Sequence, residues 1–568
     1  MAMTQEKFDT LVERLETFAR QQLGTYKLRV GLLAALGYAY IFLILAGLIF
    51  LLGLLVLLVL VSHSFNIYII KFGILLLIPT FIILRSLWVT FPPPTGLPLR
   101  RQEAPHLFSL VDELTSKLQT PRFHHILLTN EFNAGVVQRP RLGLLGWQQN
   151  YLIVGLPLIQ ALSMSQFRAV LAHELGHLSD NHSRFAGWIY RVRKTQAQIW
   201  ERLHQSGHGS SVLFEWFFNW YIPFFEAYSF VLARMNEYEA DRCAAELAGA
   251  KNTAEALINT EIKATFLEKE FWPSLEKQIH HQIEPPAAIF NDMAAVLENP
   301  LTSPNATLWF QQVLKRKTTN SDTHPCLSDR LTALGYLPKQ QQSLPLPDPV
   351  KSSAAQELLG DSINNIAAYF NSNWKLEFST VWRQKYAYYQ EVKQKLQALE
   401  EKAQKQPLSI DEAWEIAAWT LEIKGDEPAI PLLQELLKMA PDRSVANYTL
   451  GQILLQKNDA AGIEYIEAAM KKDPDYVMDG CNSIYSFLVQ QDKLPEAKVY
   501  QKRADEHYNL LLMAQKERSN ITTKDKFIPH GLPNAAVDRL RQQLSVYPEI
   551  KAAYLVKKDL AYLSLIHI

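Results

Sequence analysis

The sequence is poor in cysteine and carries no net charge. Among its 568 residues are three cysteines, and 57 basic residues balance 57 acidic ones. Cys243, Cys326 and Cys481 are far apart and odd in number, which argues against a disulfide framework or a thiolate zinc site and fits a reducing compartment. The balanced charge gives no support to a nucleic-acid partner. A chain of this length is too long for one compact core, so we expect several domains.

Charge is absent altogether from a long stretch near the N-terminus. Gly31 to Val61 is almost wholly apolar and exceeds the roughly 20 residues that cross a bilayer. After a short polar turn, Ile67 to Val89 is a second apolar run with basic residues only towards its ends. We therefore expect residues 31–91 to form a two-helix transmembrane hairpin and the lipid bilayer to be a partner.

The charged residues 1–30 precede this hairpin, and their apolar side chains recur on one helical face. The pattern predicts an amphipathic helix that either lies on the membrane surface or packs on a soluble domain, and both remain open. Basic residues flank the outer ends of the hairpin, whereas its turn has no fixed charge. The positive-inside rule then predicts a multi-pass protein of the cell (inner) membrane, with all that follows the hairpin in the cytoplasm.

A helical stretch further along contains His173-Glu174-Leu175-Gly176-His177, an H-E-x-x-H pattern. Histidines four residues apart lie one turn apart on one helix face, so both rings can bind the same metal ion. The glutamate between them can take a proton from a water on that metal. Ser163 and Gln166 form a capping-box pattern that predicts the start of this helix. The pentapeptide also occurs by chance in ordinary helices, so it needs support from elsewhere.

A zinc ion without thiolates needs nitrogen and oxygen ligands, and a third protein ligand besides the histidines. Glu237 and Asp241 are four residues apart and share a helix face. One could bind the metal while the other holds the second ring nitrogen of a histidine. Judged by its charges alone, however, this segment would more simply be a solvated helix.

Together, the two segments resemble the M48 family of zinc metallopeptidases, which includes the HtpX heat-shock proteases, the CAAX-processing proteases and several quality-control proteases. The resemblance implies one Zn²⁺ per chain, with Glu237 as the third ligand and Asp241 in the second shell. The family's histidine-proline motif and its downstream arginine correspond to His324-Pro325 and Arg330. Ala233 stands where relatives often have serine, and the further membrane spans of some relatives are not evident.

The resemblance covers residues 97–338 and implies a zincin-like metallopeptidase domain. Short strands are expected at Ile126 to Thr129 and Tyr151 to Val154, followed by helices, which favours a mostly helical α+β fold. By resemblance, Asn133-Ala134-Gly135 belongs to an edge strand that pairs with an extended protein or peptide substrate.

The resemblance also implies a mechanism. His173, His177 and Glu237 bind zinc, and Glu174 is the general base for the water that attacks the peptide carbonyl. By resemblance, His324 lies near the zinc and either helps to hold the oxyanion or acts as a switch ligand, while Arg330 and Asp241 support the zinc ligands without binding zinc themselves.

The segment between the two metal motifs is rich in aromatic residues. Val212 to Leu232 also contains acidic residues and Pro223, so we expect a buried or interfacial helix pair, with a re-entrant membrane contact as the alternative. Gln205 to Ser211, with two glycines, is predicted to be a mobile loop and a possible lid.

The remainder of the chain is expected to be helical. Residues 339–408 are predicted to be a linker and helical region, and residues 507–568 a C-terminal helical tail. Ala429, Gly462 and Ala497 recur at a period near that of tetratricopeptide repeats, so residues 409–506 are predicted to contain about three such units. These units could bind a protein partner. An unrelated helical bundle is the alternative.

Three functions are compatible with these features. The leading hypothesis is a membrane-anchored zinc metalloendopeptidase, acting in membrane or misfolded protein quality control with its catalytic and repeat domains in the cytoplasm. The second is a proteolytically inactive membrane scaffold that binds partners through its helical repeats. The third is a maturation enzyme dedicated to one substrate. The intact His173, Glu174, His177 and Glu237 favour an active enzyme.

Overall fold

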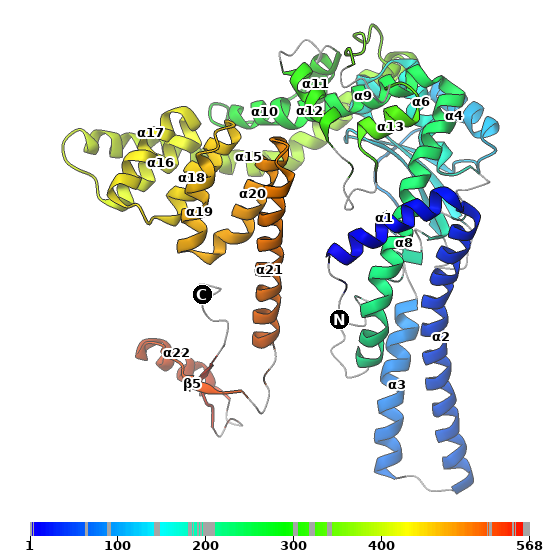
Figure 1. Ribbon diagram of the computed structural model, residues 1–568, viewed down its shortest axis with the longest axis horizontal. Coiled ribbons are helices and arrows are strands. Elements are labelled where there is room, and N and C mark those ends of the chain that lie inside the picture. The colour runs from blue at the N-terminus through cyan, green and yellow to red at the C-terminus, as the bar shows by residue number, and fades with distance from the viewer. Residues whose placement is uncertain are drawn as a thin grey trace. The chain divides into compact units, whose positions relative to one another are not determined.

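The computed structural model divides the chain into two compact units. The first contains residues 1–278 and 284–381, and the second contains residues 279–283 and 382–568 (Figure 1). The structure describes residues 3, 5–62, 66–87, 92–140, 148–179, 185, 187–189, 192–193, 196, 201, 211–298, 305–316, 318, 324–337, 344–519, 521, 525–547, 550 and 552–559.

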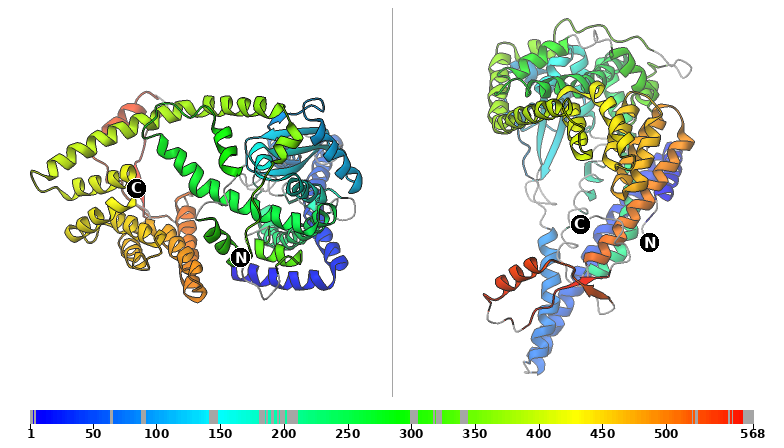
Figure 2. Two further views of the ribbon diagram at one scale, coloured as in Figure 1. Left: turned by 90° about the horizontal axis from the view of Figure 1, so that it is seen from above. Right: turned by 90° about the vertical axis from the view of Figure 1, so that its left-hand side faces the viewer.

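Three helices open the first unit: α1 (Gln5–Gln21), α2 (Leu23–Ser62) and α3 (Ile67–Leu87). Parts of α2 and α3 are long and apolar enough to cross a membrane, and the two helices run side by side (Figures 1 and 2). The break lies at Gln22, so α2 begins before the predicted boundary near residue 30. Most of the predicted turn, residues 63–65, lies outside the described residues.

Helix α1 packs on the soluble part of the first unit through one apolar face. Val12, Leu15 and Ala19 are buried in a cluster that also contains residues of α2 and of α8 (Ser211–Ala248). Arg234 of α8 donates a hydrogen bond to Glu16 of α1. Of the two placements that the sequence left open, the structure therefore has α1 against a protein surface.

A four-stranded sheet supports the central helices. Its strands are β1 (Leu97–Pro98), β2 (His125–Thr129), β3 (Ala134–Pro140) and β4 (Gln148–Gly155), in the order β1-β2-β4-β3. β2 and β4 are parallel, and β3 lies antiparallel to β4 at the sheet edge. The strands predicted around residues 126–129 and 151–154 are confirmed. Buried Leu128, Leu152 and Val154 join this sheet to the core.

The helix with the two histidines, α6 (Met164–Gly176), begins with the predicted capping box. Ser163 Oγ accepts a hydrogen bond from the Gln166 amide, and the Gln166 side chain accepts one from the Ser163 amide. Both interactions satisfy amides at the start of the helix that have no partner within it. On the face of α6 that lies away from the two histidines, Phe167 and Leu171 are fully buried, so the helix is fixed against the core.

Helix α8 corrects the prediction of a helix pair at residues 212–232. It is one helix of 38 residues that contains Pro223 and continues through Glu237 and Asp241. Proline removes one backbone hydrogen bond, but Phe218, Tyr221 and Phe225 are buried on both sides of it. We infer that this packing keeps the helix continuous. Residues 205–210 of the predicted lid lie outside the described residues.

Several shorter helices complete the first unit, with α4 and α5 beside the sheet and the others after α8. They are α4 (Pro105–Lys117), α5 (Leu156–Ala161), α9 (Ala250–Phe266), a π-helical turn η2 (Leu267–Phe271), α10 (Trp272–Gln278), α11 (Ile289–Glu298), α12 (Ala306–Lys315), α13 (Leu327–Ala333) and α14 (Ala354–Leu359). The Ala354 amide donates a hydrogen bond to the Leu162 carbonyl, 2.7 Å away, so α14 belongs to this unit, whereas the sequence analysis assigned it to a separate linker and helical region.

The second unit is built mainly from helices that pack in pairs. After α15 (Ser362–Ala403), which continues from the first unit, come α16 (Ile410–Lys424), α17 (Asp426–Met439), α18 (Ser444–Gln456), α19 (Gly462–Lys472), the 3-10 turn η4 (Pro474–Tyr476), α20 (Val477–Gln490) and α21 (Leu494–Ser519). Their classification as tetratricopeptide repeats stays a prediction. The tail is only partly helical, because α22 (Asn534–Leu544) lies between paired strands β5 (Phe527–Pro529) and β6 (Val556–Lys558).

The close packing of α6 on α8 generates a stability prediction. A Cβ atom added at Gly176 would lie 3.2 Å from the Ala240 Cα atom and 3.3 Å from Cys243 Cβ. Gly176→Ala should therefore destabilise the protein by about 1–3 kcal/mol, because the two helices must move apart. The midpoint of thermal unfolding of the detergent-solubilised protein measures this effect. Gly24→Ala, where an added Cβ has no atom within 4 Å, should not lower the midpoint, and equal losses in the two variants would contradict the prediction.

Candidate metal centre

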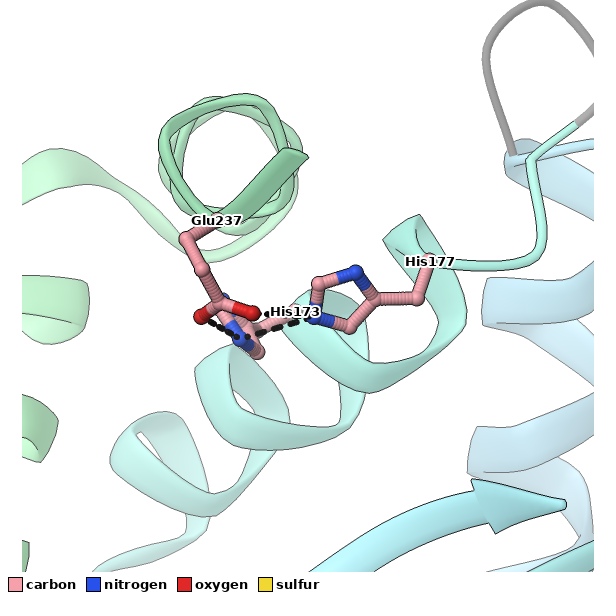
Figure 3. A group of neighbouring side chains, drawn as sticks. All are labelled: His173, His177 and Glu237. Carbon is pink, nitrogen blue, oxygen red and sulfur yellow. Dashed lines mark hydrogen bonds and ion pairs between the residues drawn. The ribbon is translucent and has the colours of Figure 1, made fainter. Parts of the chain in front are cut away.

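Two helices bring three potential metal ligands together. His173 and His177 come from the C-terminal end of α6, and Glu237 comes from α8. Figure 3 shows the two imidazole rings and the carboxylate turned toward a common point. Their ligand atoms all lie within 4.8 Å of one another. Residues separated by about 60 positions in the sequence therefore form one compact donor set.

The spacing of these atoms fits a zinc ion. His173 Nε2 lies 3.3 Å from His177 Nε2 and 3.6 Å from Glu237 Oε2, and His177 Nε2 lies 3.5 Å from Glu237 Oε1. Tetrahedral ligands about 2.1 Å from zinc lie about 3.4 Å apart. Glu237 Oε2 is buried, and His324 Nδ1 lies 2.8 Å from it without meeting the geometry of an aligned hydrogen bond.

A second layer of polar contacts fixes His173. Asp241, one turn after Glu237, is 1 % exposed, and its Oδ1 lies 3.0 Å from His173 Nδ1. Arg330 of α13 donates two hydrogen bonds to the same carboxylate, at 2.8 and 2.6 Å. Burial would raise the pKa of Asp241, but the hydrogen bonds from Arg330 and His173 hold it below its usual value. An ionised Asp241 favours a proton on Nδ1 of His173, so a metal ion has to displace only the proton on Nε2.

The two histidines differ in their electrostatic surroundings. Burial by itself lowers the pKa of His173, but the Asp241 and Glu237 carboxylates more than offset this and raise it to about 9. Burial and the charge of His173 lower the pKa of His177 to about 4. Burial would raise the pKa of Glu237, yet its histidine partners keep it far below its usual range. The carboxylate is therefore available to a cation at neutral pH.

Glu174 lies on the same helix and is partly buried. Burial raises the pKa of its carboxyl to about 7, while the positive charges of His173, His324 and Arg330 oppose the shift. Within the described residues its side chain has no hydrogen-bond partner. A carboxylate in these surroundings suits transfer of a proton near neutral pH.

His324 reaches the same centre from the segment before α13. Its Nδ1 lies 2.8 Å from Glu237 Oε2, while its side chain is 70 % exposed. The Glu237 carboxylate raises the pKa of this imidazole above its usual value. The ring can therefore contact both the buried centre and a molecule that approaches from solvent.

The predicted substrate-binding residues lie at the edge of the sheet. Ala134 and Gly135 begin β3, and the Asn133 carbonyl accepts a hydrogen bond from the Gly155 amide of β4. Because hydrogen-bonding directions alternate along a strand, the outward-facing backbone groups belong to Ala134, Val136 and later even-numbered residues. β3 also packs against α6, so this open edge runs beside the helix with the two histidines.

One polar contact that supports the centre has no local signal in the sequence. Arg168 of α6 donates hydrogen bonds to both carboxylate oxygens of Glu113 on α4, at 3.0 and 2.6 Å. The interaction lowers the pKa of Glu113 to about 2. The partners are 55 residues apart, so only the folded chain reveals the pair.

The comparison with known protein families agrees with this geometry. Residues 117–337 match the model of Peptidase family M48. No curated protein matches the chain. The matched segment contains the intact group of His173, His177 and Glu237. The chain is therefore a metallopeptidase, and its cofactor is zinc.

The contacts of Asp241 predict how the centre responds when its supporting charge is removed. Asp241→Asn should weaken zinc binding by about 10- to 100-fold, because the amide holds the His173 ring and Arg330 less well. Competition with a chromogenic chelator measures the zinc affinity of the full chain in detergent. Glu246→Gln, an exposed position on the same helix, is the matched control and should retain wild-type affinity. An unchanged affinity in Asp241→Asn would show that this carboxylate does not support the ligands.

Proposed function

We propose, on the premise that residues 117–337 are a zinc-binding M48 peptidase domain, that the chain is a membrane-anchored endopeptidase for membrane or misfolded proteins. The convergence of His173, His177 and Glu237 is the observation that carries this proposal. The two helices that are long and apolar enough to cross a membrane support the anchoring. The distribution of basic residues favours insertion of the hairpin in the cell (inner) membrane with the catalytic domain on the cytoplasmic side.

In the proposed reaction, a bound zinc ion supplies Lewis-acid activation of water and of the substrate carbonyl. Glu174 accepts the proton of the attacking water and returns it to the nitrogen of the leaving amine. His324 donates a hydrogen bond to the carbonyl oxygen as negative charge develops there. Asp241 and Arg330 keep His173 oriented through the contacts described above.

The substrate would bind to the open edge of β3. The outward-facing carbonyl of Ala134 and the amide and carbonyl of Val136 can pair with an extended peptide, as in strand addition to a sheet. Backbone pairing is independent of side chains, so it suits varied unfolded sequences. Asn133 supports the start of this strand, because its side chain accepts a hydrogen bond from the Ala134 amide at 2.9 Å.

The helices of the second unit would deliver or retain partner proteins. One buried cluster contains residues of α16, α17 and α18, and a second contains residues of α18, α19, α20 and α21, so successive helix pairs share core residues, which is typical of stacked repeats. Such stacks present extended surfaces to peptides. The partner role is independent of catalysis and would persist in an inactive variant.

Replacement of the general base tests the proposed reaction. Glu174→Gln should keep zinc but lower the rate of cleavage of an unfolded protein by about 10²- to 10⁴-fold, because the amide cannot accept the proton. Metal content by elemental analysis and peptide release by mass spectrometry provide the two readouts. Glu246→Gln should retain both properties.

The same measurements distinguish the enzyme from a scaffold. A zinc-loaded wild-type chain that cleaves no unfolded protein would support the scaffold and overturn the proposed activity. If Glu174→Gln cleaves as fast as the wild type, the assignment of Glu174 as the base is wrong.

A proline substitution tests the role of the β3 edge. Val136→Pro removes an outward amide without breaking the pairing with β4. It should lower kcat/KM by about 5- to 10-fold, which corresponds to one hydrogen bond of about 1 kcal/mol. Val136→Ala keeps the amide and should cleave normally. Equal activity of both variants, with zinc bound, would exclude pairing at this position.

A further inference from the structure

Helix α8 contacts the first membrane helix and also supplies a zinc ligand. The Phe217 ring stacks on Tyr40 of α2, with 3.9 Å between the ring centroids, and the Tyr221 hydroxyl donates to the Leu33 carbonyl at 2.9 Å. Tyr228 stacks on Tyr26, with 5.9 Å between the centroids. Later residues of α8 therefore contact earlier residues of α2. The two helices are therefore antiparallel neighbours over this length, as Figure 1 also shows.

The α2–α3 hairpin indicates where the lipid core ends. The apolar part of α3 has 19 residues and ends at Arg85. It is about 28 Å long, which matches a hydrocarbon core of about 30 Å. An added Cβ at Gly73 would contact Leu55, and Ile83 belongs to the same buried cluster as Leu45. The end of α3 therefore places the upper edge of the lipid core near Arg85 and Leu45, and exposed apolar side chains of α2 continue above this edge to Leu32.

Two tryptophans of α8 lie just above this edge. Trp216 is 74 % exposed and Trp220 is 42 % exposed. Their neighbour Phe217 contacts Tyr40, which is about 8 Å along α2 from Leu45. Exposed tryptophan at this depth is typical of the headgroup region of a bilayer. The hairpin fixes this depth, so the lipid surface is the occupant that the geometry favours for these side chains.

The distance from this region to the metal centre follows from the length of α8. Glu237 comes about 20 residues after Phe217 in one continuous helix, and 20 residues of α-helix extend about 30 Å. A tilt of about 20° would shorten this height by less than a tenth. The zinc ligands are therefore held well above the lipid.

We propose that α8 is a spacer that seats Trp216 and Trp220 in the lipid headgroups and holds the zinc centre about 30 Å from the membrane surface. This inference rests on the proposed function and specifies its substrate class. The substrates are membrane-anchored proteins that are cut in an extended segment, at least about nine residues from the bilayer at about 3.3 Å per residue. The zinc centre cannot reach peptide bonds within the bilayer or directly beside it.

A reporter with a single transmembrane span tests the spacer. Its cytoplasmic part is a repeating unfolded sequence, so every distance from the membrane offers the same bonds. The full chain and the reporter are reconstituted in the same phosphatidylcholine–phosphatidylglycerol vesicles, and mass spectrometry identifies the cut nearest to the membrane. We expect this cut at about nine residues or more from the bilayer. Cuts at about two to five residues would overturn the proposal.

A soluble peptide with the repeating sequence separates this test from a test of the activity itself. The enzyme should cut this peptide along its whole length. If the soluble peptide is not cut, the proposed function fails. If it is cut and the anchored reporter is cut beside the membrane, the spacer alone is wrong.

Lipid quenching tests the position of the tryptophans directly. In vesicles of lipids brominated near the headgroup, the variant with Trp216→Phe and Trp220→Phe should lose part of the quenchable fluorescence. Trp309→Phe, at a buried position of α12 in the first unit, is the control and should lose none of it. An unchanged quenchable fraction in the double variant would overturn the interfacial position of α8.

Discussion

The contact between α6 and α8 is the constraint on which the metal centre depends. α6 supplies the imidazoles and α8 the carboxylate, so the ligand spacing is set by how closely the two helices approach. Gly176 directly precedes His177, and the absence of a side chain there lets Ala240 come close. The sheet, the capping box and the Arg168–Glu113 pair all hold α6 in this position.

Patterns with a short period were predictable from the sequence. The spacing of His173 and His177 fixes their common face, and the polar cap at Ser163 marks the start of their helix. The apolar runs likewise identified α2 and α3. The continuity of α8 through Pro223 was not predictable, because it depends on aromatic packing against α2. The membership of α14 in the first unit also depends on a contact between distant residues.

The candidate site shows the same division between local and distant information. Helix spacing suggested Asp241 as a site residue, and the resemblance to a family suggested His324 and Arg330; the structure brings all three to the ligands. No local pattern indicates that Arg330 joins Asp241, because they are 89 residues apart. Their pairing nevertheless controls the charge around His173, so the electrostatics of the site is a property of the fold.

The ion pair between Glu16 and Arg234 has a consequence for how the protein folds. Its partners are 218 residues apart, and Arg234 lies one turn before a zinc ligand. During synthesis, α1 emerges long before its surface on α8 exists, and the loop between them must close against chain entropy. Contacts of such long range slow folding. The catalytic unit therefore cannot fold segment by segment from its N-terminus. Helix α1 stays without its packing surface until α8 has been synthesised.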